Sequence, residues 1–298
     1  MRVDPNYIST LAAAVNQSSS VEDKLTSELS SGLRVSSLAD DPVAVAQSTQ
    51  MNSILSRDDT YVQTASSVTS RMQVADTTLG EVVTQLTSAL SLAVEGNNGT
   101  LNAANRASVA QQLSGIRDQV LSLANTSYLG QYLFGGSQGS TQPFTLNTAT
   151  TPATATYNGD ANLQYVETPS GQKIQVSVPG SNLFGGAAGA FAALNQLIAD
   201  VSSSAGSAAI SADTGALKDA ISQVSNQRSI LDTSLSTVQT TSTYVQTQAA
   251  QLKVLQSSLV AADPASVATQ LSTAETQHKA LLSVMSAIGK TDLFDYMR

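Results

Sequence analysis

Residues 51–93 decide the fold of this chain, with the sequence MNSILSRDDTYVQTASSVTSRMQVADTTLGEVVTQLTSALSLA. Their apolar residues recur at alternating steps of three and four positions, and Asp58 interrupts the register. An apolar residue at about every 3.5 positions is the pattern by which helices pack side by side as a coiled coil. The stripe consists of Met51, Ile54, Tyr61, Ala65, Val68, Met72, Ala75, Leu79, Val82, Leu86, Ala89 and Ala93.

A second stripe with the same spacing lies far along the chain and is interrupted at Arg228, Ser242 and Gln256. Two long stripes can bury each other if their helices pack against one another. We therefore predict a mainly α fold, a long antiparallel coiled-coil helical rod built from both chain ends. Rods of this kind more often build assemblies than catalyse reactions. The second stripe consists of Leu217, Ile221, Val224, Leu231, Leu235, Val238, Val245, Ala249, Leu252 and Leu259.

The pattern changes between two copies of the sequence Leu-Phe-Gly-Gly in the middle of the chain. Apolar and polar residues alternate over 174–178, which indicates a strand. Asn158-Gly159 is the sequence of a two-residue hairpin turn. We predict a small β-rich insertion domain at residues 137–186.

Two Asp-Pro pairs, Asp41-Pro42 and Asp263-Pro264, have the sequence of helix starts. The Asp carboxylate can accept hydrogen bonds from free backbone N–H groups, and Pro fits the first helical turn. We expect the last helix to end at Gly289. The predicted domains are a terminal helical coiled-coil assembly domain (1–40 plus 260–298), a helical rod domain (41–136 plus 187–259) and the variable insertion domain (137–186).

Shorter apolar stripes with heptad spacing lie in the helices predicted at the two ends of the chain. Isolated amphipathic helices of this length are marginal in water, so we expect them to need neighbours that cover their apolar faces. We predict that they form an assembly interface. Its residues are Ile8, Leu11, Val15, Leu25, Leu29, Val267, Leu271, Ala274, His278, Leu281, Met285 and Ile288.

Charge and composition exclude several classes of function. Charged residues make up 12% of the chain, about half the usual share, so its surface is largely neutral and polar. The net charge is −8 and Lys and Arg are not clustered, which argues against nucleic-acid binding. No apolar run is long enough to span a membrane, and the start lacks the pattern of a signal peptide. These signals predict a cytoplasmic protein unless export follows another route.

The sequence offers little for catalysis, and we predict no catalytic, metal or cofactor-binding residue. There is no cysteine, and the single histidine, His278, falls on an apolar stripe and cannot hold zinc alone. Gly289-Lys290-Thr291 looks like the end of a phosphate loop, but Val284 stands where that motif needs glycine. The acid pairs Asp40-Asp41 and Asp58-Asp59 are explained by a helix start and a solvated face.

Several motifs, in the correct order, resemble those of the flagellin superfamily. Residues 29–35 and 39–42 resemble its N-terminal signature, and residues 97–125 are similar to its second signature. Tyr132 to Gly136 and the run from Asp263 to Tyr296 also fit. The insertion carries no matching motif, as expected of the variable part of such proteins.

Two roles within this superfamily remain open, a filament subunit and an adaptor at the junction of hook and filament. Asp41-Pro42 replaces the usual Asp-Asp-Ala-Ala, and residues 292–298 lack a leucine-rich ending, which favours the adaptor. The resemblance then implies export in the unfolded state through the flagellar type III apparatus and an extracellular location at the flagellum. It implies as partners a ring of copies of the chain, the hook-side junction protein, filament flagellin and a cytoplasmic export chaperone.

Two alternatives come from other classes of protein. A soluble coiled-coil signalling rod, like the cytoplasmic hairpin of a chemoreceptor, would share the heptads but would not explain the β-rich insertion. An enzyme inserted at 137–186 would have neither His nor Cys to work with.

Overall fold

The computed structural model describes residues 5–99, 101–185 and 189–296, and the side chains of 7–99, 101–185 and 189–287. The chain divides into two compact units. The terminal unit combines residues 1–56 with 248–298, and the central unit comprises residues 57–247.

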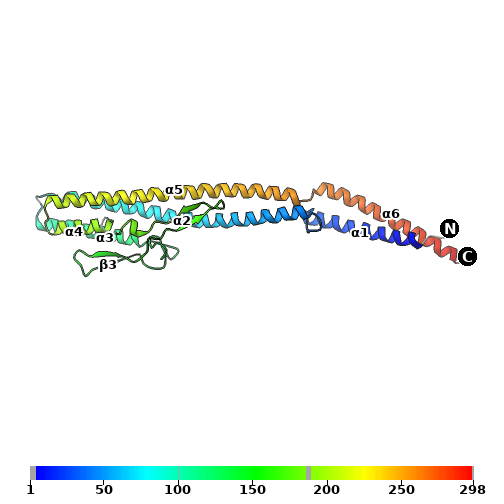
Figure 1. Cartoon of the computed structure of the whole chain (residues 1–298), viewed down its shortest axis with the longest axis horizontal. Coiled ribbons are helices and arrows are strands. Elements are labelled where there is room, and N and C mark those ends of the chain that lie inside the picture. The colour runs from blue at the N-terminus through cyan, green and yellow to red at the C-terminus, as the bar shows by residue number, and fades with distance from the viewer. Residues whose placement is uncertain (1–4, 100, 186–188, 297–298) are drawn as a thin grey trace. The chain divides into compact units, whose positions relative to one another are not determined.

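The described chain is mainly helical, which confirms the predicted fold class (Figure 1). Two long helices carry the two apolar stripes, and short strands lie between them in the sequence. The predicted division into assembly, rod and insertion domains stays a prediction. The helices are α1 (Pro5–Ser31), α2 (Pro42–Gly96), α3 (Ala103–Ala124), α4 (Ala190–Ser202), α5 (Ser207–Val260) and α6 (Pro264–Tyr296). The strands are β1 (Ser127–Tyr128), β2 (Gln131–Tyr132), β3 (Phe144–Asn147), β4 (Thr154–Tyr157), β5 (Tyr165–Glu167) and β6 (Lys173–Gln175).

Helices α2 and α6 begin at the prolines of the two Asp-Pro pairs. The Asp41 Oδ1 accepts hydrogen bonds from the backbone N–H groups of Val43 (3.2 Å) and Ala44 (3.0 Å). The Asp263 Oδ1 accepts one from the N–H of Ala265 (3.0 Å). Each carboxylate thus satisfies donors that a helix start leaves free.

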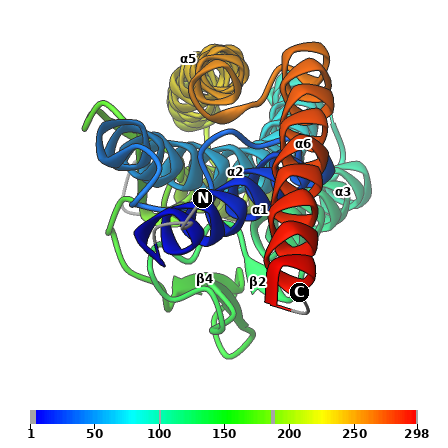
Figure 2. The same cartoon turned by 90° about the vertical axis from the view of Figure 1, so that its right-hand side faces the viewer.

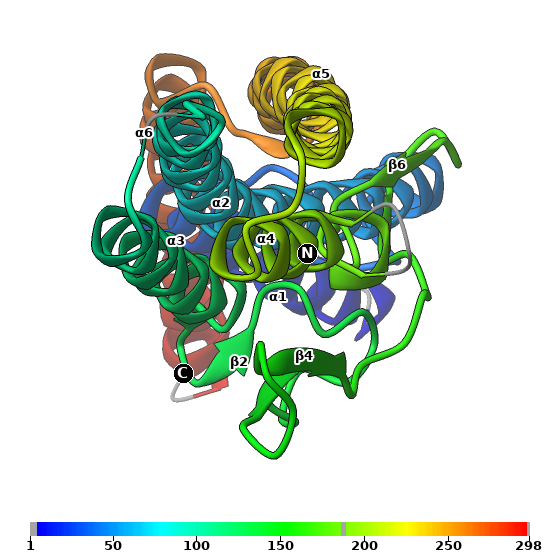
Figure 3. The same ribbon diagram turned by 90° about the vertical axis from the view of Figure 1, so that its left-hand side faces the viewer.

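The core of the central unit forms where α2 and α5 pack together, with α3 and α4 beside them (Figure 3). Leu79 and Leu86 of α2 and Leu217 and Val224 of α5 are fully buried in one continuous cluster. Burying a side chain of this size contributes about 1.5–3 kcal/mol. The heptad stripes therefore supply much of the apolar core of this unit.

The two Leu-Phe-Gly-Gly copies meet in the core of the central unit. The ring centroids of Phe134 and Phe184 lie 5.8 Å apart in an edge-to-face arrangement. Phe144 of β3 and Phe191 of α4 join them, with centroids 5.2 Å apart. The backbone N–H of Gly180 donates to the carbonyl of Phe134 (2.8 Å), which ties the two segments together. This aromatic cluster anchors the β-rich segment against the helices.

Within the described residues the β-rich segment forms separate antiparallel hairpins rather than one sheet. Strand β3 pairs with β4, with Phe144 opposite Tyr157, and β5 pairs with β6, with Val166 opposite Ile174. The prediction that Asn158-Gly159 forms a hairpin turn is wrong, because β4 pairs with the strand before it. The Asn158 N–H instead donates to the Pro143 carbonyl (2.7 Å).

Two helix boundaries also differ from the sequence-based expectation. Helix α6 continues to Tyr296 rather than ending at Gly289. A glycine inside a helix costs only about 1 kcal/mol relative to alanine and does not have to end it. Helix α5 begins at Ser207, ten residues before its apolar stripe starts at Leu217. Only Ile210 in that first stretch is both large and buried, so apolar periodicity could not reveal it.

The end of α4 faces the start of α5 through a pair of carboxyl groups. Asp213 is 6% exposed, and its Oδ2 has no hydrogen-bond partner among the described residues. Burial raises the pKa of Asp213 to about 6, and the hydrogen bond that its protonated carboxyl donates to Asp200 and the negative charge of Asp200 add to the shift. One proton shared between two carboxyl groups relieves their repulsion.

This pair gives the central unit a defined pH dependence. Because the pKa of Asp213 is higher in the folded than in the unfolded chain, ionising it lowers stability as the pH rises from about 4 to about 6. Asp213→Asn should therefore raise the free energy of unfolding by about 2 kcal/mol at pH 7.5 and leave it unchanged at pH 4. Chemical denaturation at both pH values checks this, with Asp219→Asn, an exposed acid on the same helix, as the control. An equal effect at both pH values would refute the assignment.

Candidate functional site

The two terminal helices pack against each other within the terminal unit (Figure 2). Leu25 of α1 and Val267 and Ala274 of α6 form a small buried cluster, and Leu271 and Ala262 pack against its edge. Part of the cover that we expected neighbours to supply therefore comes from within the chain. Each stripe covers part of the other, since the two ends of the chain come together.

The proposed interface residues differ widely in exposure. Leu25, Val267 and Ala274 are buried, whereas Ile8 and Leu29 remain 44% and 42% exposed. The rest of the described set lies half-buried, and the side chain of Ile288 lies outside the described residues. The half-buried residues are Leu11, Val15, Leu271, His278, Leu281 and Met285.

Apolar surface remains open along both terminal helices beyond the predicted set. Tyr7 is 53% exposed and Val21 40% exposed on α1, and Leu282 and Val284 are each 43% exposed on α6. The Nδ1 of His278 is buried without a hydrogen-bond partner among the described residues. The helix pair therefore presents apolar surface that a neighbouring molecule can bury.

A connector, residues 32–41, joins α1 to α2 and is bound by backbone hydrogen bonds to the end of α5. Gly32 has φ +70°, a left-handed conformation that suits glycine at a helix end. The N–H of Arg34 donates to the carbonyl of Val260 (2.8 Å), and the N–H of Ala262 donates to the carbonyl of Gly32 (2.9 Å). The Arg34 guanidinium adds a bond to the carbonyl of Leu259 (2.9 Å). These bonds hold the end of α1 against the junction of α5 and α6.

Asp40 organises the polar side of this connector. Its Oδ2 accepts hydrogen bonds from the backbone N–H groups of Ser36 (3.2 Å) and Ser37 (2.9 Å), and Lys24 of α1 lies 3.0 Å from its Oδ1. The hydrogen bond from Lys24, followed by those from Ser37 and Ser36, holds the pKa of the Asp40 carboxyl well below its usual range. Asp40 therefore stays ionised across physiological pH and fixes the connector to α1.

Sequence reasoning missed several residues of this site. Lys24 and Glu28 line a groove of about 420 Å³ between α1 and the start of α6, with Gln270 on the opposite side. Val35 and Ala44 are buried although they lie outside the apolar stripes. The sequence did contain a signal for the role of Asp40. Ser36 and Ser37 precede it closely, and Ser and Asp side chains commonly form hydrogen bonds in turns.

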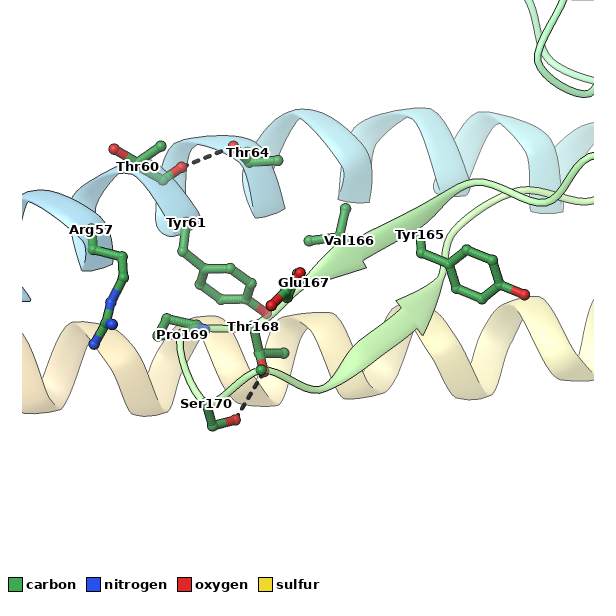
Figure 4. A pocket seen from close by; sticks show the side chains of 11 residues that line it. Arg57, Thr60, Tyr61, Thr64, Tyr165, Val166, Glu167, Thr168, Pro169 and Ser170 are labelled. Atoms are coloured by element: carbon green, nitrogen blue, oxygen red, sulfur yellow. Dashed lines mark hydrogen bonds between the residues drawn. The ribbon is translucent and has the colours of Figure 1, made fainter.

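A second pocket, of about 690 Å³, lies in the central unit beside the β5–β6 hairpin. Figure 4 shows Tyr61 of α2 pointing toward this hairpin and Tyr165 on the hairpin itself. Arg57 and Glu167 are the charged residues that line it. The hydrogen bonds drawn between lining residues in Figure 4 join Thr168 to Ser170 and Thr64 to the Thr60 carbonyl, and neither pairs a hydroxyl with the Glu167 carboxylate.

The described residues also bear on metal binding and on membrane crossing. No group of three or more His, Cys, Asp or Glu side chains in that part of the chain is placed to hold a metal ion. No described helix has the length and apolar character needed to cross a membrane.

Comparison with known proteins agrees with the arrangement of the helices. Residues 6–139 match the bacterial flagellin N-terminal helical region, and residues 214–297 match the bacterial flagellin C-terminal helical region. Two solved structures share the fold. One is a putative flagellar hook-associated protein from Vibrio parahaemolyticus, with TM-score 0.66, 18% identity and coverage of 74% of this chain and 100% of that chain. The other is the flagellar junction protein FlgL from Legionella pneumophila, with TM-score 0.53, 16% identity and coverage of 64% and 97%.

Two curated relatives are similar over part of their length. Flagellar hook-associated protein 3 of Salmonella typhimurium is 30% identical over 162 residues, 54% of this chain and 49% of the relative. Flagellar hook-associated protein 3 of Escherichia coli is 34% identical over 122 residues, 41% of this chain and 38% of the relative. The matches thus span half or less of these relatives. Because the two terminal flagellin regions match in order and together cover most of the sequence, the chain belongs to the flagellin family.

Proposed function

We propose that this protein is a structural adaptor of the bacterial flagellum that joins the hook to the filament. The proposal rests on the similarity to two proteins named flagellar hook-associated protein 3. The terminal regions alone do not separate the two roles, because filament flagellin has them as well. Asp41-Pro42, whose carboxylate caps α2, also favours the adaptor over the filament subunit. Such a protein is structural, and it lies outside the cell at the hook–filament junction.

The terminal helices supply the physical basis for assembly. Helices α1 and α6 bury only a small cluster around Leu25 and leave Ile8, Leu29, Leu282 and Val284 open. Apolar surface of this kind is stabilised when neighbouring helices cover it. The proposed neighbours are other copies of the chain in a ring, the hook-side junction protein and filament flagellin.

Export precedes assembly in this proposal. The chain leaves the cytoplasm unfolded through the flagellar type III apparatus, and an export chaperone binds it beforehand. The predicted interface residues remain the proposed assembly determinants, and the two Asp-Pro pairs serve as helix starts.

Deleting the gene tests the role directly. An adaptor predicts cells with complete hooks but no attached filaments, and unattached flagellin in the medium. Filaments of normal length on the deletion strain would exclude the adaptor. Loss of the filament protein itself would instead identify the chain as filament flagellin.

A further inference from the structure

A cavity of about 730 Å³ opens between α3, the end of α4 and the turn that joins β3 to β4. Figure 3 shows α3 and α4 side by side, with the β4 hairpin beside them. The apolar wall of the cavity includes Ala110 of α3, Pro152 of the turn and Ile198 of α4. The cavity is large enough for a side chain or small ligand to enter.

A buried cation lies in the wall of this cavity. Arg117 is 6% exposed, and its guanidinium has five N–H donors. The Nε and Nη2 donate to Oδ1 of Asp118 at 3.0 Å and 2.8 Å, and Nη1 donates to the carbonyl of Ala153 at 3.2 Å. Two N–H groups are left without an acceptor among the described residues. Each of the three nitrogens makes at least one hydrogen bond, so the guanidinium is already ion-paired but keeps two N–H groups for a further acceptor.

The acceptor best suited to the two remaining N–H groups is a carboxylate. Asp118 approaches from the Nε side of the guanidinium and is itself about half exposed, with 54% of its side chain accessible. Terminal N–H groups of an arginine match the two oxygens of a second carboxylate in spacing and direction. The apolar wall at Ala110 and Ile198 suits the methylene groups of an acidic side chain.

The charge of the chain points to the source of that carboxylate. Asp and Glu number 22 against 14 Lys and Arg, so copies of this chain present many more acids than bases to one another. We propose that the cavity at Arg117 receives an Asp or Glu side chain from a neighbouring copy of this chain. This inference rests on the proposed function, because the assembly places copies side by side. A contact between two different patches of identical subunits is the kind that closes a ring.

A substitution that supplies the carboxylate from within the chain tests the proposal. Ser114 lies three residues before Arg117 on α3 and lines the same cavity, so Ser114→Glu pairs with the guanidinium and blocks the neighbour's acid. We expect the variant to keep the thermal stability of the wild type and to enter isolated flagella about tenfold less. The matched control, Gln112→Glu, adds the same charge on the exposed face of α3 and should enter normally. Normal entry of Ser114→Glu would overturn the proposal.

Chemical labelling gives a readout that does not depend on substituting charge. The chain contains no cysteine, so Ser203→Cys places a single thiol at the cavity, and Ser140→Cys places one at an exposed position outside it. Maleimide should react with Cys at position 203 about tenfold more slowly in isolated flagella than in the purified chain. At position 140 the rate should be the same in both samples. Unchanged reaction at 203, or equal slowing at both positions, would overturn the proposal. Absence of the unsubstituted chain from flagella would instead contradict the proposed function.

Discussion

Replacing Asp58 with leucine is expected to raise the free energy of unfolding of the central unit by about 3 kcal/mol. Asp58 does not lie on a solvated face as expected from the sequence: it is 2% exposed, and its Oδ2 has no hydrogen-bond partner among the described residues. Burial raises the pKa of its carboxyl group, against the opposing effect of Arg57. The substitution removes the cost of a buried charge and restores an apolar residue to the interrupted heptad register.

Thermal denaturation followed by circular dichroism measures this effect. A gain of about 3 kcal/mol corresponds to an increase of about 6–12 °C in Tm for a unit of this size. Asp59→Leu is the matched control, because Asp59 is exposed and its replacement should change stability by less than about 0.5 kcal/mol. A Tm for Asp58→Leu at or below that of the wild type would contradict the prediction. It would show that interactions in the folded chain offset the cost of burying the Asp58 carboxylate.

The double substitution Leu25→Asp and Leu281→Asp is expected to abolish assembly while the central unit stays folded. Leu25 lies in the buried cluster between α1 and α6, and Leu281 lies half-buried further along α6. An unpaired carboxylate at the first position separates the helices, and one at the second opposes apolar contact with a neighbour. The core around Leu79 and Leu217 contains neither residue, so its thermal transition should persist.

Immunoblots of isolated flagella measure assembly, and thermal denaturation of the purified variant measures folding. We expect less than about one-tenth of the wild-type amount in flagella, since a loss of 1.4 kcal/mol already corresponds to a factor of ten. Ser27→Asp with Ser283→Asp is the matched control, because both serines are exposed on the same helices. Wild-type incorporation of the leucine variant would show that these stripes are not the assembly interface.

The helical part of the fold could be predicted from the sequence because its cause is local and repetitive. Leu79, Val82 and Leu86 fall on the predicted register and are fully buried. Asp41-Pro42 likewise predicted the start of α2, since capping depends on neighbouring residues. Periodicity failed at the start of α5, where Ser207 to Ala216 offer few apolar residues.

Features that depend on contacts between residues far apart in the sequence could not be predicted from local spacing. The approach of Phe134 to Phe184 brings together segments far apart in sequence, and no local spacing predicts it. Asn158-Gly159 carried a strong turn signal, but the strand before it pairs with an earlier partner. Arg117 lies between Leu113 and Val120 on the buried face of α3, a position where a charged residue should prompt a search for its partner.

The terminal unit shows the same division between local and distant causes. Heptad spacing predicted apolar faces on α1 and α6, but not that Leu25 would meet Val267 and Ala274 in one cluster. Lys24 and Asp40 lie 3.0 Å apart because the connector turns back along α1, which the sequence alone does not specify.

Immunogold electron microscopy of intact flagella tests the proposed role most directly. The antibody should be raised against residues 140–186, which lie outside both matched flagellin regions and include exposed positions such as Thr145 and Asn147. The adaptor role predicts gold particles confined to the junction between hook and filament. Gold along the whole filament would identify a filament subunit, and gold confined to the cell interior would contradict a place in the flagellum.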